Sequence, residues 1–251
     1  MAQLARIYPL HSTLEGFTPY HPQAQVCLAC GVRQFALFGV LDEEALQSIH
    51  LRIADLTLQP GDHLYDGEEP GGAVYTLRSG VIRLERSSEA GERRILRLAG
   101  RTDLIGLESL LGQTYASDAV ACTPVQACRI PRALIEELWA DHPELARDLM
   151  KRWQRALDDA EEWLTELARG SARHRMLRLL LKLSEFSDPA GGVWLPTRQE
   201  MGAMLDLTFE TASRVLSALR RDGVVEVLDS RSASLSMPHL LAALNEEGRG
   251  R

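Results

Sequence analysis

The chain has 251 residues, of which 45% are hydrophobic and 25% are charged. This composition suits a folded globular protein and excludes a wholly disordered one. No window holds the roughly 18 consecutive apolar residues of a membrane span, and residues 1–14 lack the pattern of a signal peptide, so we expect a cytoplasmic protein. The formal net charge is −7, yet residues 169–251 carry 12 Lys and Arg against 10 Asp and Glu. This C-terminal third is where a polyanion would be bound.

Residues 41–140 consist of short apolar runs separated by turn signals. Leu56–Leu58 is followed by Pro60-Gly61-Asp62, and Val74–Leu77 is followed by Ser79-Gly80. Turns at intervals of roughly 8–12 residues predict a small antiparallel β-barrel or sandwich. The interior of such a barrel can hold a ligand or be filled by its own side chains.

The periodicity becomes helical after Pro131. Apolar residues then recur at alternating steps of four and three, which predicts a dimerisation seam made of Leu149, Trp153, Ala156, Ala160, Trp163 and Leu167. A helix lying on its own domain is the alternative. Two tryptophans flanked by acidic residues favour a partner helix, and we expect a homodimer. Gly170-Ser171 ends this pattern, and a Leu-rich helix over 172–186 follows.

Two short helices are predicted near the C-terminus. Thr197 and Glu200 have the spacing of a capping box at the start of the first helix, which carries Met201, Met204 and Leu205. After a short connection, Thr208 can cap the second helix. The expected buried positions of that second helix are Phe209, Ala212, Leu216 and Leu219. This arrangement predicts a helix-turn-helix whose second helix enters the major groove of DNA.

The opposite face of the second helix is polar. Arg214 can donate two hydrogen bonds to guanine, Glu210 can accept one from cytosine, and Ser213 can reach a base or a phosphate. Each residue alone would suit an ordinary solvated surface, but together they favour base reading. Two further strands after Gly223 predict a wing. The expected DNA-contacting residues are Thr197, Thr208, Glu210, Ser213, Arg214, Ser217 and Arg231.

This order of parts resembles the CRP/FNR family of bacterial transcription regulators, and Glu210-Thr211-Ala212-Ser213-Arg214 is similar to the E-x-x-S-R pattern of the FNR branch. The resemblance implies an α+β fold, with a cyclic-nucleotide-binding-like β-barrel (jelly roll), a long dimerisation helix and a winged helix-turn-helix. It also implies binding of inverted repeats with TTGAT-like half-sites, and RNA polymerase as a partner. The expected divisions are 1–40, 41–140, 141–169 and 170–251. No enzyme motif is found, so we expect a non-enzyme.

Four cysteines supply candidate metal ligands. Cys27 and Cys30 form a C-x2-C pair, and Cys128 lies where the FNR branch has its distant cluster cysteine, but Ala36 stands at the third cysteine position of that branch. The resemblance implies an iron-sulfur cluster of the 4Fe-4S type that senses redox state, oxygen or nitric oxide. Cys122 could replace the missing ligand if the turn at Thr123-Pro124 brings the strands of Cys122 and Cys128 side by side. Zinc, haem, a dithiol switch, and a small organic effector with incidental cysteines and no cofactor remain alternatives.

Cyclic AMP is disfavoured by one departure from the family pattern. Cyclic-nucleotide binders of the family hold the phosphate with an arginine some ten residues after a Gly-Glu pair. Here Gly106 and Glu108 are followed by Tyr115 or Ala116 at that place. A buried phosphate would lack its cation.

Overall fold

The described part of the chain forms two compact units. The computed structural model describes residues 37–40, 49, 52–88, 91, 93–188 and 190–249. One unit comprises residues 1–84 and 98–157, and the other comprises residues 85–97 and 158–251. Cys27, Cys30 and Ala36 lie outside the described residues. Within them, no helix combines the length and apolar character needed to cross a membrane.

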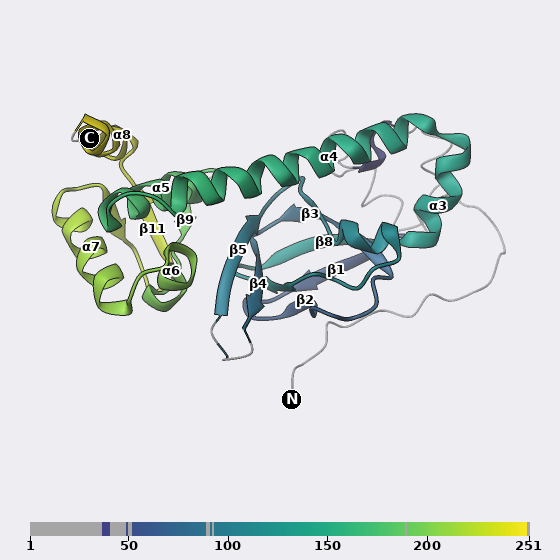
Figure 1. Ribbon diagram of the computed structural model, residues 1–251, viewed down its shortest axis with the longest axis horizontal. Coiled ribbons are helices and arrows are strands. Elements are labelled where there is room, and N and C mark those ends of the chain that lie inside the picture. Colours follow the sequence, from purple (N-terminus) through teal and green to yellow (C-terminus); the bar gives the residue numbers. More distant parts are fainter. Residues whose placement is uncertain are drawn as a thin grey trace. The chain divides into compact units, whose positions relative to one another are not determined.

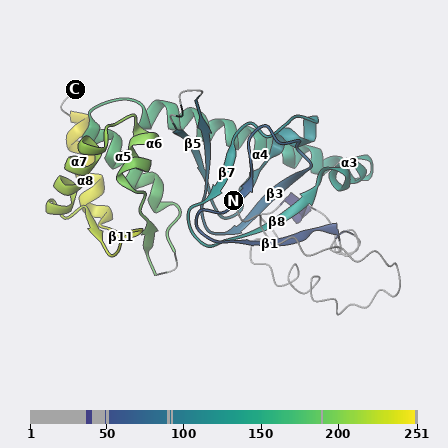
Figure 2. The same ribbon diagram turned by 90° about the horizontal axis from the view of Figure 1, so that it is seen from below.

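Eight strands form two four-stranded antiparallel sheets. The first sheet has the order β1 (Ala54–Leu58), β8 (Val125–Pro131), β3 (Ala73–Ser79) and β6 (Leu104–Ile105). The second has the order β2 (His63–Tyr65), β7 (Asp118–Ala121), β4 (Ile82–Ser87) and β5 (Arg93–Ala99). Figure 2 shows β1, β8 and β3 lying side by side. These two strand orders make a jelly roll, which confirms the expected fold class.

Alternating burial explains why these segments form strands. Leu56 and Leu58 of β1 are buried, whereas Asp55 and Thr57 between them are exposed. The chain reverses where glycine is required. Gly80 has a φ of +83°, and a Cβ there would lie 2.3 Å from the carbonyl oxygen of Pro124, so no other residue fits this turn.

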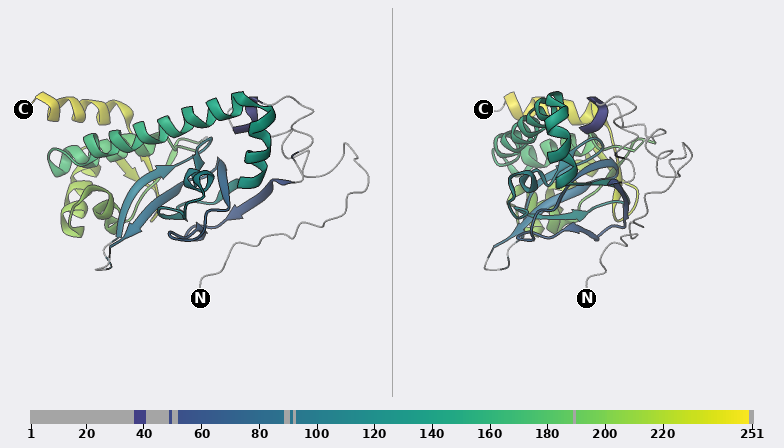
Figure 3. Two further views of the ribbon diagram at one scale, coloured as in Figure 1. Left: turned by 45° about the vertical axis from the view of Figure 1, so that its right-hand side comes forward. Right: turned by 90° about the vertical axis from the view of Figure 1, so that its right-hand side faces the viewer.

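The jelly roll has an inner and an outer apolar cluster. The inner cluster lies between the sheets and contains Leu56, Tyr65, Tyr75, Leu77, Ile82 and Tyr115 among its members. The outer cluster covers the far side of the first sheet, where Val74 and Ile130 pack with residues of two helices. These helices are α3 (Arg132–Asp141) and α4 (Pro143–Glu162), and Figure 3 shows the sharp bend between them.

The expected dimerisation seam is wrong for three of its six residues. Leu149, Trp163 and Leu167 are only 4%, 8% and 2% exposed, because they pack within the chain itself. Ala156 and Ala160 are half-buried. The apolar residues that remain exposed along α4 and the following π-turn η5 (Trp163–Leu167) are Met150, Trp153, Leu157 and Leu164. The fold therefore buries three of the residues that the sequence assigned to a partner helix, whereas Trp153 of the same set stays exposed.

The second unit contains a winged helix-turn-helix. Its helices are α5 (Ala172–Ser184), α6 (Arg198–Leu205), α7 (Phe209–Arg221) and α8 (Met237–Arg249). The strands β10 (Val225–Val227), β11 (Ser232–Leu235) and β9 (Gly192–Trp194) form one antiparallel sheet in that order. Figure 1 shows α6 and α7 as neighbouring short helices. Ser171 caps α5, which confirms the break predicted there.

Candidate nucleic-acid interface

The helix-turn-helix begins at the predicted capping box. The Thr197 hydroxyl accepts a hydrogen bond from the Glu200 amide at 3.2 Å, and the Glu200 carboxylate accepts one from the Thr197 amide at 2.7 Å. These reciprocal bonds satisfy two amides that a helix start otherwise leaves unpaired. Met201, Met204 and Leu205 are buried as expected. The capping bonds and the buried side chains thus hold α6, the first helix of the motif, in place.

A close backbone approach makes the turn between the helices tight. The Leu207 amide donates to the Gly202 carbonyl at 3.2 Å. A Cβ on Gly202 would lie 2.5 Å from the Leu207 oxygen, so this connection requires glycine. Thr208 then caps α7 by accepting from the Thr211 amide at 3.3 Å, as the sequence predicted.

The recognition helix α7 has a buried side and an exposed polar side. Ala212, Leu216 and Leu219 are fully buried, as predicted. Glu210 and Arg214 are exposed, and Ser213 and Ser217 are half-buried. Within the described residues neither Glu210 nor Arg214 is held in an ion pair, so both polar groups are available to a ligand. Phe209 differs from the prediction, because it is 59% exposed rather than buried.

Arg231 is engaged within the protein. Its guanidinium donates to the two carboxylate oxygens of Glu200 at 2.6 and 3.2 Å and lies 5.3 Å from the ring centroid of Trp194. Burial by itself would raise the pKa of Glu200, but hydrogen bonds from Arg231 and Thr197 hold it below its usual range. These contacts tie the wing to the start of α6. They favour a positioning role for Arg231, and its predicted phosphate contact stays a prediction.

A groove lies between α7 and the wing, and Ser217 is the one lining residue that the sequence had pointed to as a DNA contact. It is lined by Ser217, Arg220, Arg221, Gly223, Val225, Glu226 and Val227. The side chains of Arg220 and Arg221 both line this groove. A pair of neighbouring guanidinium groups suits a phosphate backbone. The sequence signal was available, since Arg220 and Arg221 are adjacent at the end of the helix.

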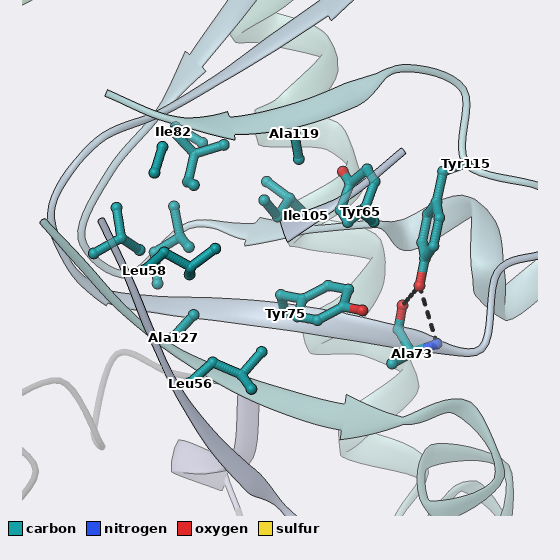
Figure 4. Close-up of a cluster of buried hydrophobic side chains, with 14 residues drawn as sticks. Leu56, Leu58, Tyr65, Ala73, Tyr75, Ile82, Ile105, Tyr115, Ala119 and Ala127 are labelled. Atoms are coloured by element: carbon teal, nitrogen blue, oxygen red, sulfur yellow. Dashed lines mark hydrogen bonds between the residues drawn. The ribbon is translucent and has the colours of Figure 1, made fainter. Parts of the chain in front are cut away.

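Three tyrosines, Tyr65, Tyr75 and Tyr115, pack together in the interior of the jelly roll. The ring of Tyr115 stacks on Tyr65 with centroids 4.0 Å apart, and its hydroxyl donates to the Ala73 carbonyl at 2.9 Å (Figure 4). Burial, followed by the neighbouring Tyr75 hydroxyl, raises the pKa of Tyr115 above its ordinary value, so the phenol stays neutral. Glu108 accepts a hydrogen bond from the Ala116 amide at 2.9 Å. The residues present do not fit a cyclic phosphate, because they offer it a neutral hydroxyl in a packed interior.

The two described cysteines lie on different sheets. Cys122 follows β7, and its sulfur is 3.9 Å from the Arg83 guanidinium. Cys128 is in β8 and packs against the outer cluster. The prediction that Thr123-Pro124 brings their strands side by side is wrong, because β7 and β8 belong to opposite sheets of the jelly roll. In the described part of the chain, no three His, Cys, Asp or Glu residues are gathered as a metal site.

Comparison with known proteins matches both units. Residues 55–142 match the cyclic nucleotide-binding domain, and residues 174–244 match the Crp-like helix-turn-helix domain. The transcriptional activator protein FnrL of Cereibacter sphaeroides is 30% identical over 214 residues, which are 82% of this chain and 86% of FnrL. The transcriptional activator protein anr of Pseudomonas aeruginosa is 29% identical over 213 residues, which are 81% of this chain and 86% of its own.

Solved structures show the same architecture. FixK2 from Bradyrhizobium japonicum matches with a TM-score of 0.68 at 27% identity, over 76% of this chain and 96% of FixK2. A CRP/FNR-family transcriptional regulator from Thermus thermophilus matches with a TM-score of 0.63 at 28% identity. The match covers 77% of this chain and 100% of the Thermus chain. With these relatives and both domain matches, the chain belongs to the CRP/FNR family of transcription regulators.

Proposed function

We propose that the protein binds inverted repeats with TTGAT-like half-sites as a homodimer and regulates transcription from them. The observation that carries this proposal is the exposed polar side of α7, where Glu210 and Arg214 stand free beside a fully buried apolar side. Recognition helices of this motif place such N-terminal residues against base edges in the major groove. Because relatives are named transcriptional activators, we also propose activation, with RNA polymerase as the partner.

Competition binding on a TTGAT-type inverted repeat and its single-base variants tests the base readers. Arg214→Ala is expected to lose discrimination at its guanine by about 1–3 kcal/mol per contact, while affinity for unrelated DNA changes little. Glu210→Ala relaxes the preference at the pair from which it accepts. Arg155→Ala, which removes an exposed arginine from α4, is the matched control and leaves both affinities unchanged. Equal weakening of specific and unrelated DNA by Arg214→Ala would contradict the assignment.

The homodimer is proposed to form through the strip that the fold leaves exposed. This strip consists of the exposed Met150, Trp153, Leu157 and Leu164 together with the half-buried Ala160, and its steps are three and four residues. Leu157→Glu would bring two carboxylates together across a twofold axis. We therefore expect sedimentation velocity to show that the dimer is at least about tenfold weaker than in wild type. Leu111→Glu, at another exposed leucine, is the control. A dimer unchanged by Leu157→Glu contradicts this interface.

The proposed signal acts at Cys27, Cys30 and Cys128. Cys128 packs against the outer cluster, which also contains Leu37 and Phe38 from the segment that follows the C-x2-C pair, and Leu145 and Leu149 of α4. A change at the thiols can therefore alter packing against α4 and bias the dimer. Thiolates of this set would hold an iron-sulfur cluster, which supplies the redox or oxygen sensitivity when bound.

The ultraviolet-visible spectrum of protein purified without air tests this sensor. A broad band near the blue without a Soret peak supports the cluster, and we expect Cys128→Ser to lose it and Cys122→Ser to keep it. A Soret peak would establish haem instead. A featureless spectrum would favour a small organic effector and incidental cysteines.

A further inference from the structure

A buried hydroxyl group that forms no hydrogen bond lies in the first sheet of the jelly roll. Thr76 of β3 is only 2% exposed, and in the part of the chain that the structure describes its Oγ1 has no hydrogen-bond partner. Valine would fill nearly the same volume, and it would not leave a buried polar group unpaired, which costs free energy. The hydroxyl of Thr76 therefore lowers the stability of the fold, and packing alone does not explain it.

Strand register places this hydroxyl next to the sulfur of Cys128. Thr76 stands directly opposite Cys128 of β8, so the two side chains point to the same face of the sheet, with Cβ atoms about 4.5–5.5 Å apart. That face carries the outer cluster, which contains Val74 and against which Cys128 packs. On its other side Thr76 stands opposite Leu104, whose side chain offers no acceptor. The acceptor within reach of the hydroxyl is therefore the sulfur, above all when it carries negative charge.

A second donor lies over the same place. Arg78 of β3 forms an ion pair with Asp55 of β1, and β8 lies between these two strands in the sheet. Because Asp55 stands opposite Cys128, the guanidinium group passes over β8 close to that cysteine. The Nε of Arg78 is also buried and forms no hydrogen bond within the described residues. Cys128 is thus bordered by a hydroxyl donor and by a cation, and these surroundings suit a sulfur with negative charge.

We propose that Thr76 is a positioning residue of the proposed sensor, whose hydroxyl donates a hydrogen bond to the sulfur of Cys128 when an iron-sulfur cluster is bound there. This inference rests on the proposed function and adds to it a residue outside the cysteine set. A sulfur that binds iron retains negative charge, and the hydrogen bonds around it help to decide how firmly the metal is held. The free energy that the buried hydroxyl costs in the protein without iron is then recovered when iron is bound.

Thr76→Val, which keeps the volume and removes the hydroxyl, tests the inference on the full chain purified without air. In the presence of an iron chelator, its visible absorption is expected to disappear about tenfold faster than that of wild type, because the donor to the sulfur is gone. Thr76→Ser keeps the hydroxyl and should lose its absorption at nearly the wild-type rate. Once the iron has been removed, we expect Thr76→Val to have a melting temperature about 2–4 °C above that of wild type. A hydroxyl with a merely structural role would not produce two effects of opposite sign.

Thr57→Val is the matched control, because Thr57 is an exposed threonine on β1 of the same sheet. It should change neither the rate nor the melting temperature. If Thr76→Val loses its absorption at the wild-type rate, or if it melts below wild type after the iron has been removed, the inference is overturned and the proposed iron-sulfur cluster stands. If wild type shows no such absorption, the proposed iron-sulfur cluster fails and this inference fails with it.

Discussion

The interior of the jelly roll and the recognition helix are two places where a member of the family can bind a ligand. In this chain the first is packed with side chains, whereas the second has exposed polar groups. In the jelly roll, three tyrosines pack in the interior and the Tyr115 hydroxyl bonds to the backbone of Ala73. On α7, the charged residues Glu210 and Arg214 are exposed, and neither forms an ion pair with another residue that the structure describes. A domain can thus pack its interior with its own side chains, whereas a surface that is to bind a ligand must leave its polar groups accessible.

The largest effect is expected from emptying the filled interior. Tyr115 is 4% exposed, so Tyr115→Ala removes a buried aromatic ring and should lower the free energy of unfolding by about 3–5 kcal/mol. Urea unfolding followed by circular dichroism measures the loss. Leu111→Ala, at a residue that is 61% exposed, should change it by less than about 0.5 kcal/mol. A tolerated Tyr115→Ala would show that the interior is not packed around this ring.

A smaller loss is expected where the reading unit does use a charge internally. Glu200→Gln weakens the hydrogen bonds to Arg231 and Thr197 and should lower the free energy of unfolding by about 1–3 kcal/mol. DNA affinity should fall alike for all sequences, because the wing loses its anchor. Glu226→Gln, at an exposed carboxylate of β10, is the control and should leave stability unchanged. A loss confined to specific DNA would contradict the positioning role of this pair.

The same ion pair predicts a pH dependence. The pKa of Glu200 is lower in the folded protein than in the unfolded chain, where glutamate titrates near about 4.3. Its contribution is therefore fully present above that value and is lost as the pH falls through the folded pKa. Urea unfolding from pH 7 to pH 3 should show the stability difference between wild type and Glu200→Gln narrowing at the acidic end. A constant difference would mean that the carboxylate is not held ionised by its partners.

Cyclic AMP is expected to leave the melting temperature of the protein unchanged, which tests directly whether the interior of the jelly roll can bind a ligand. A nucleotide present at a hundred times its dissociation constant would stabilise the folded protein by about 2.7 kcal/mol and raise its melting temperature. We expect no shift at millimolar cyclic AMP or cyclic GMP, because Tyr115 and Tyr65 fill the interior. A clear upward shift would show that the tyrosines move aside for a ligand.

Local signals in the sequence predicted local structure well. The strands and turns of the jelly roll, the break at Gly170-Ser171 and the caps at Thr197 and Thr208 follow from side-chain alternation and from hydrogen bonds between near neighbours. The winged helix-turn-helix followed from the same signals. Each of these features is decided within a few residues of chain.

Features that depend on packing between segments far apart in the sequence could not be predicted. α4 carries two apolar strips, and only the tertiary structure decides that Leu149 is buried while Met150 is 73% exposed. Phe209 was expected inside because periodicity counts hydrophobic residues without knowing where the helix bundle ends. The sequence at Thr123-Pro124 suggests a hairpin turn. In the structure the Thr123 hydroxyl accepts a hydrogen bond from the Val81 amide, and the chain crosses to the other sheet.

The pairing of β1 with β8 has a consequence for how the chain matures. Ala54 stands opposite Arg129, so the first strand finds its partner only after most of the jelly roll has been synthesised. Contacts between such distant segments fold slowly, since a long loop must close before they form. During translation β1 therefore lacks the strand with which it pairs until β8 has left the ribosome. The helices α6 and α7 contact each other across three residues and can assemble as soon as both are made.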